Sequence, residues 1–81
     1  MGGEQPALAL TPRVQRIMAE AQRIAREAGH DYIGTEHLQL GIIAIGGGVA
    51  SDVLNQLGQA DAIRDKIKEV MSSDGYNTPT D

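Results

Sequence analysis

The chain has 81 residues and no cysteine, so it is long enough for one small domain and cannot rely on disulfides or thiolate metal sites. Its net charge is −4, with 11 acidic against 7 basic residues, which argues against a nucleic-acid partner because such binders present a basic face. No apolar run approaches the roughly 18 residues of a membrane span, and the N-terminus lacks the features of a signal peptide. We expect a soluble, cytoplasmic protein with no membrane partner.

The first predicted helix spans about 12–28. Thr11 is a good N-cap, Pro12 suits the first helical position, and Gly29 is a typical left-handed residue after a helix end. Apolar residues recur along one face at spacings of three and four: Val14, Ile17, Met18, Ala21, Ala25 and Ala28. Residues 1–10 lack such periodicity and are predicted to form a flexible arm.

The other face of this helix carries charged residues: Arg13, Arg16, Glu20, Arg23, Arg26 and Glu27. A pair such as Arg23–Glu27, four residues apart, contributes only about 0.2–0.5 kcal/mol. A solvated face is therefore the favoured interpretation, and docking of an adaptor or another partner is the alternative.

The second helix is predicted over 35–45, with Thr35 as its N-cap. Its apolar residues point in nearly every direction, so this helix should be central and the most buried: Leu38, Leu40, Ile42, Ile43 and Ile45. The following Gly46-Gly47-Gly48 ends it. Because the pattern GxxxxGK[ST] is absent, we interpret the glycines as a flexible connector rather than a phosphate-binding loop.

A third helix is predicted over 48–57 with Gly58 as its cap, and a fourth over 61–72 with Asp61 at its start, where a negative charge suits the helix dipole. Residues 73–81 contain Gly, Asn, Thr and Pro and are predicted to be a disordered tail. No alternation typical of strands is present. The sequence therefore predicts an all-α domain of four helices joined by short loops.

Polar side chains surround the start of the second helix: His30, Asp31, Glu36 and His37. Metal-binding pairs on a helix stand three or four residues apart, whereas Glu36 and His37 are adjacent and diverge by about 100°. We predict no metal site, no cofactor and no catalytic residues here, so the chain is not expected to be an enzyme. His37 should be a core residue bonded to a backbone carbonyl, and Tyr32 should pack over the helix junction with its hydroxyl in water.

The segment Tyr32-Ile33-Gly34-Thr35-Glu36-His37, with Leu38 and Leu40-Gly41 after it, closely resembles the repeat that builds the N-terminal domain of the Clp ATPases. The resemblance covers roughly residues 10–72 and includes Gly48-Val49-Ala50, Leu57-Gly58 and Ile63-Arg64. It implies a small orthogonal-type helical domain made of a single Clp repeat, residues 11–72, where the family domain has two. The stretch between Gly58 and Arg64 looks one residue shorter than usual, which puts the start of the fourth helix in doubt.

The resemblance implies a non-catalytic protein-interaction module of the Clp proteolytic system, acting on substrates, phosphoarginine-marked segments or adaptors. In that family the Glu of the Gly-Thr-Glu-His segment lines a pocket for phosphoarginine, so Glu36 and Thr35 carry over as candidate ligand-binding residues. A carboxylate can pair bidentately with a guanidinium while helix N-terminal amides take the phosphate. The plainer interpretation is that Glu36 only favours the helix dipole, by about 0.3–1 kcal/mol.

Two further functions stay open at this point. The chain could be a free-standing decoy or regulator that mimics the unfoldase's own N-terminal domain, or a structural homo-oligomer without a Clp role. The sequence contains no Walker motif, so it is not expected to hydrolyse ATP. Because a lone repeat should leave apolar surface uncovered, we expect a homodimer, although another protein could supply the missing repeat.

Overall fold

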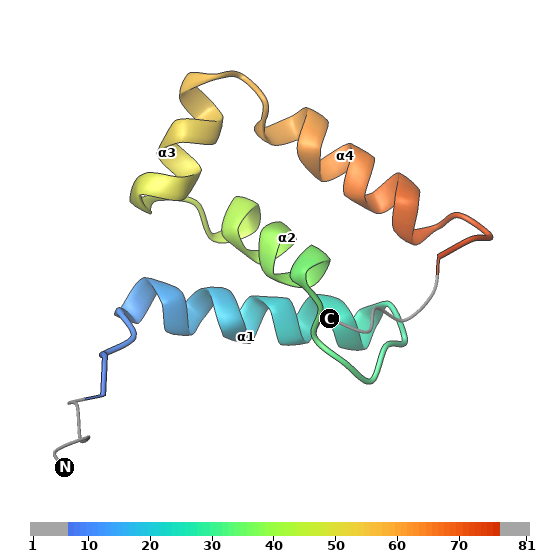
Figure 1. Cartoon of the computed structure of the whole chain (residues 1–81), viewed down its shortest axis with the longest axis horizontal. Coiled ribbons are helices and arrows are strands. Elements are labelled where there is room, and N and C mark those ends of the chain that lie inside the picture. The colour runs from blue at the N-terminus through green and yellow to red at the C-terminus, as the bar shows by residue number, and fades with distance from the viewer. Residues whose placement is uncertain (1–6, 77–81) are drawn as a thin grey trace, which may run out of the picture.

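The computed structural model describes residues 7–76, which form four helices: α1 (Pro12–Glu27), α2 (Thr35–Ile45), α3 (Gly48–Gln56) and α4 (Ala60–Met71). No strand occurs in this part of the chain. Helix α2 lies between α1 and α4, and α3 links α2 to α4 at one end of the molecule (Figure 1). The all-α prediction is confirmed, and the helix ends differ from the expected ones by at most one residue.

The C-terminus of α1 closes in a Schellman motif around Gly29. The N–H of Gly29 donates to the carbonyl of Arg26 at 3.0 Å, and the N–H of His30 donates to that of Ala25 at 2.9 Å. Gly29 has a φ of +79°, which confirms the predicted left-handed cap. The motif reverses the chain within two residues and so brings His30 back beside the start of α2.

The first two helices begin with different caps. At α1, Thr11 Oγ1 accepts the Val14 N–H at 3.2 Å, as predicted. At α2 the N-cap is Gly34, so the prediction of Thr35 as N-cap is wrong, and Thr35 is the first helical residue. The reason is that His37 performs the capping: its ring Nδ1 accepts the Gly34 N–H at 2.8 Å, while the Gly34 carbonyl accepts the His37 N–H at 3.1 Å.

The glycine run between α2 and α3 has a defined conformation. Gly46, Gly47 and Gly48 all have positive φ, at 70°, 72° and 75°, which residues with a Cβ adopt only at a cost. The Arg13 side chain from α1 lies over the run, because a Cβ on Gly47 would stand 2.9 Å from Arg13 Nε. The run is thus an extended connector with positive φ angles, covered by an arginine, and α3 lies at 79° to α2.

The core is small and lies mainly between α1 and α2. Its fully buried apolar side chains are Ala21, Ala25 and Leu40. The two helices approach closely at Gly41, where an added Cβ would stand 2.9 Å from the carbonyl oxygen of Ile17. Helix α2 contacts all three other helices, which confirms its predicted central position.

The described part of the chain is elongated, and its α3 helix is apolar on the outside. The principal extents are 50 × 31 × 19 Å, and the radius of gyration is 15.0 Å, against about 11–12 Å for a compact domain of this size. Val49 and Val53 on α3 and Leu57 at its C-cap recur every four residues and are 81%, 45% and 66% exposed. They form one uncovered surface, here called the α3 stripe.

Within residues 7–76, no single helix has the length and apolarity to cross a membrane. Helices α2 and α3 pass that test only as a pair, bent at the glycine run, and only by length and composition.

Part of the segment predicted to be a disordered tail has a defined position. Residues 73–76 follow α4 in a turn, in which Ser73 Oγ donates to the Val70 carbonyl at 2.6 Å and the Tyr76 N–H donates to the Ser73 carbonyl at 3.2 Å. Tyr76 is half-buried. The rest of the predicted tail, 77–81, and most of the predicted N-terminal arm, 1–6, lie outside the described residues.

Candidate functional site

Four rings gather where α1 ends and α2 begins: His30, Tyr32, His37 and Tyr76. The His30 ring stacks on Tyr32 with a centroid distance of 5.0 Å and on Tyr76 with one of 5.4 Å. His37 meets His30 and Tyr32 edge-on at 5.1 and 5.3 Å. This ring cluster joins three separate segments of the chain and surrounds the carboxylate of Glu36.

His37 is the centre of the cluster, with no exposed surface. Because its Nδ1 accepts the Gly34 N–H, its proton is assigned to Nε2, which then donates to His30 Nδ1 at 2.9 Å. Burial lowers the pKa of His37, against the opposing effect of Glu36, so the ring is neutral at pH 7. The predicted core histidine is confirmed, but its backbone partner is an N–H group rather than a carbonyl.

The Glu36 side chain folds back over Gly34 at the start of α2. A Cβ on Gly34 would collide with Glu36 Oε1, so a larger residue here would push the Glu36 side chain out of this position. The Tyr76 hydroxyl donates to Glu36 Oε2 and also bonds the Tyr32 hydroxyl at 2.6 Å. The Tyr32 hydroxyl, which was expected to reach water, has a protein partner in Tyr76. Thr35, the other predicted site residue, is exposed beside this carboxylate.

The surroundings of Glu36 favour its ionised form. Burial opposes the charge, but hydrogen bonds from Tyr76 and from its own backbone N–H, with the nearby imidazoles, lower the pKa of Glu36. Burial and the same contact raise the pKa of the Tyr76 phenol well above its usual value. Tyr76 therefore stays protonated and acts as the donor to a carboxylate anion.

A hollow of about 310 Å³ opens beside this carboxylate, between the start of α2 and the end of α4. Its walls are Glu36, Lys66, Ile67, Val70, Met71 and Tyr76. Lys66 pairs with Glu69 at 2.6 Å on the exposed side of α4. The surface exposed in the hollow is almost entirely apolar, although Glu36 and Lys66 are among the residues that line it.

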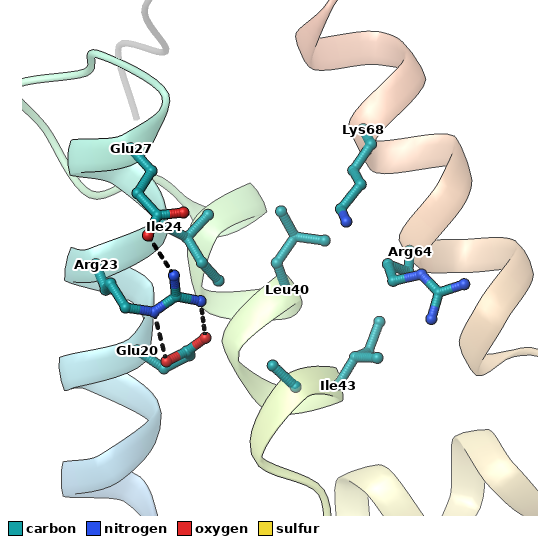
Figure 2. Close-up of a pocket in the computed structure, with 9 residues that line it drawn as sticks. Glu20, Arg23, Ile24, Glu27, Leu40, Ile43, Arg64 and Lys68 are labelled. Carbon is teal, nitrogen blue, oxygen red and sulfur yellow. Dashed lines mark hydrogen bonds and ion pairs between the residues drawn. The ribbon is translucent and has the colours of Figure 1, made fainter.

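A second concave surface lies between α1 and α4, with α2 as its floor (Figure 2). This groove of about 480 Å³ has an apolar floor that includes Leu40 and Ile43. On its α1 wall, Arg23 is held between Glu20 and Glu27, with 2.6 Å between Arg23 Nη1 and Glu27 Oε2, so the predicted pair is confirmed. Lys68 extends towards the groove from α4 (Figure 2).

The structure brings together residues that the sequence analysis treated separately. Tyr76 was assigned to the tail, and His30 was considered only as a metal ligand. The available signal for Tyr76 was that it is one of only two aromatic residues and stands in a polar segment. Among residues 7–76, no three His, Asp or Glu side chains are placed to hold a metal ion.

Comparison with known proteins decides the family. The sequence matches the Clp repeat (R) N-terminal domain over residues 9–77. The chain belongs to this family. This match confirms the resemblance found in the sequence. Clp repeat N-terminal domains are the modules through which Clp ATPases interact with substrates and adaptors.

Individual relatives of this Clp repeat are much longer proteins. It is 40% identical over 74 residues to the chaperone protein ClpB of Oceanobacillus iheyensis, which covers 88% of this chain and 9% of that protein. It is 41% identical over 64 residues to the negative regulator of genetic competence ClpC/MecB of Bacillus subtilis, covering 78% and 8%. With the chloroplastic ClpC of Pisum sativum it shares 52% over 48 residues, covering 59% and 5%. The chain thus spans less than a tenth of these relatives.

Proposed function

We propose that this Clp repeat binds phosphoarginine-marked segments of protein substrates or adaptors, without catalysis, through Glu36 and Thr35. The observation that carries the proposal is an ionised carboxylate at the first turn of α2, which lines a hollow together with Ile67, Val70 and Met71. A fixed anion next to such a hollow selects a cationic group on an aliphatic stem.

Each part of a phosphoarginine side chain finds a complementary group at this site. The guanidinium pairs with the Glu36 carboxylate, which presents two oxygens to a planar fork of donors. The phosphate lies near the N-terminus of α2, where Thr35 and the partial positive charge of the helix attract it. On the other wall of the hollow, Ile67 and Val70 pack against the aliphatic stem.

Calorimetric titration with free phosphoarginine tests the proposal. Wild type should bind, and Glu36→Gln should lose at least tenfold in affinity while losing at most about 1 kcal/mol of stability, the usual size of a helix-dipole contribution. Asp52→Asn, which removes an exposed acid on α3, is the matched control and should bind like wild type. Equal affinities in the two variants, or no binding by wild type at millimolar ligand, would contradict the proposal.

We infer that the partners are components of a Clp system, because the domain family supplies substrate and adaptor contacts to Clp ATPases. Affinity capture with the wild-type chain should recover Clp subunits, adaptors or arginine-phosphorylated proteins, and Glu36→Gln should recover fewer of the last group. Recovery of this chain alone would instead support the structural homo-oligomer.

The α3 stripe supports a second proposal, self-association as a homodimer. Three apolar side chains in one row are exposed on a chain whose buried apolar core consists of only Ala21, Ala25 and Leu40 among the described residues. A closed two-fold contact would cover the stripe of each copy with that of the other. Sedimentation at micromolar concentration should show a dimer for wild type and a monomer for Val53→Asp.

Asn55→Asp places the same charge elsewhere on α3 and should leave the dimer intact. A folded wild-type chain that stays at 8.6 kDa as its concentration rises would refute self-association.

A further inference from the structure

The turn after α4 carries the chain back onto the candidate ligand site. Helix α4 ends at Met71, and Ser73 and Tyr76 are joined by a backbone hydrogen bond at 3.2 Å. The Tyr76 hydroxyl reaches Glu36, 40 residues away, and Tyr32, 44 residues away. Its ring is stacked over His30 at an interplanar angle of 29°. Tyr76 is thus held by one aromatic face and two polar contacts.

Tyr76 and a guanidinium ligand need the same part of Glu36. The Tyr76 hydroxyl takes Oε2, while Oε1 lies against Gly34. A bidentate guanidinium needs both oxygens with their outward lone pairs free. The Tyr76 ring also forms part of the wall of the hollow beside Glu36. Because each carboxylate oxygen has two lone pairs, the Tyr76 hydroxyl occupies one acceptor position of Oε2 and competes there with a ligand that pairs with both oxygens.

We propose that Tyr76 is a latch that closes the Glu36 site and must move away before a guanidinium can bind. The inference rests on the proposed function, in that Glu36 has to be a ligand residue for the latch to regulate anything. In the latched state the Tyr76 hydroxyl donates a hydrogen bond to the Glu36 carboxylate, which stabilises the site when no ligand is bound. In the open state a guanidinium replaces one phenolic donor with two charged ones.

The anchoring of Tyr76 is suited to reversible opening. The turn holding it is short, with one side-chain bond from Ser73 to Val70 and two backbone bonds, from Ser73 to Val70 and from Tyr76 to Ser73. A hydrogen bond to a charged group changes an equilibrium constant by roughly ten- to a hundredfold, which is enough to keep the site closed without making it inaccessible. A bound peptide would displace the turn and not the helices.

The first test measures phosphoarginine affinity in Tyr76→Phe, which keeps the ring and removes only the competing hydroxyl. We expect about tenfold tighter binding than wild type. Tyr32→Phe is the matched control, because it also removes one hydroxyl from the ring cluster but leaves the Tyr76–Glu36 bond, and it should change affinity much less. An unchanged affinity in Tyr76→Phe, or an equal gain in Tyr32→Phe, would overturn the latch.

The second test needs no ligand. Chymotrypsin cleaves after exposed tyrosines, so cleavage after Tyr76 reports how often the latch opens. Glu36→Ala should speed this cleavage about tenfold, whereas Asp52→Asn should not change it. An unchanged rate in Glu36→Ala would also overturn the latch.

Together the two tests separate the latch from the function on which it rests. If wild type binds phosphoarginine and Tyr76→Phe binds no more tightly, the latch is wrong while the proposed function stands. If neither protein binds phosphoarginine but Glu36→Ala frees Tyr76, the proposed ligand is wrong and the regulatory role of the latch falls with it, although the contact itself is real.

Discussion

At the junction of α1 and α2 the polar side chains find partners within the chain, whereas on the outer surface of α3 the apolar side chains are not covered by it. At the junction, His37 has no exposed surface and both of its ring nitrogens are hydrogen-bonded. On α3, Val49 and Leu57 are 81% and 66% exposed. The polar groups of the junction thus have partners within the chain, whereas the apolar side chains of α3 stay uncovered in the single copy.

Leaving a buried polar group without a partner costs more free energy than leaving an apolar side chain exposed. A buried polar group without a partner costs about 1–3 kcal/mol, so a junction that buries imidazoles has to satisfy them. Among residues 7–76, no buried side-chain nitrogen or oxygen lacks a hydrogen-bond partner. An exposed valine carries no such penalty and becomes favourable once another surface covers it.

The largest effect on stability is expected from removing His37, at the centre of the junction. His37→Ala leaves the Gly34 N–H and His30 Nδ1 without their partner and opens a cavity, so we expect a loss of about 2–4 kcal/mol in the free energy of unfolding. Chemical denaturation measures it. Thr35→Ala, two residues before His37 and exposed, is the control and should stay within about 0.5 kcal/mol of wild type. A similar loss in both variants would mean that the junction is not specifically stabilised by His37.

The next effect tests how tightly α1 and α2 pack. In Gly41→Ala the new Cβ would stand 2.9 Å from the Ile17 carbonyl oxygen, so the helices must separate. Overpacking costs about 1–3 kcal/mol and outweighs the gain of about 1 kcal/mol in helix propensity, so we expect a net loss of up to about 2 kcal/mol. Gly75→Ala is the control, because nothing lies within 4 Å of its added Cβ. A more stable Gly41→Ala would show that the helices do not pack closely there.

A third prediction concerns acid. The folded-state pKa of His37 is lowered, so the unfolded chain binds more protons below about pH 6.5, and stability should fall as the pH drops from there through the folded-state pKa. The pKa of Glu36 is also lowered, so its contribution is present above about pH 4.5 and is lost as the pH falls through its folded-state pKa.

Thermal unfolding between pH 8 and pH 3 measures both contributions. Glu36→Gln should remove the decline at lower pH and keep the one that begins near pH 6.5. Stability that does not change between pH 7 and pH 5 would contradict the assignment of a buried neutral His37.

The smallest expected effect is on α3. Val49→Ser should change the unfolding free energy by no more than about 0.5 kcal/mol at low concentration, because the side chain is already 81% exposed. If the α3 stripe is an interface, the same variant should become less stable than wild type as the concentration rises. A loss above 1 kcal/mol that does not depend on concentration would show that Val49 packs within its own chain.

The local structure of this Clp repeat was determined by the sequence. The ends of α1 and α3 follow from Gly29 and Gly58, because a Schellman or left-handed cap involves only residues within one turn of the helix end. The central position of α2 follows from its apolar residues on every side. The sequence also placed Glu36 and His37 in the first turn of α2, because the start of a helix depends mainly on nearby residues.

The candidate site itself was decided by the tertiary structure. Neither the capping of Gly34 by the His37 ring nor the hydrogen bond between His37 and His30 follows from a propensity, since threonine and glycine are about equal as N-caps. The Tyr76–Glu36 contact spans 40 residues, and the residues near Tyr76 contain nothing that specifies such a partner. Local sequence fixes helices because their hydrogen bonds close within four residues, but contacts between distant residues depend on how the helices pack.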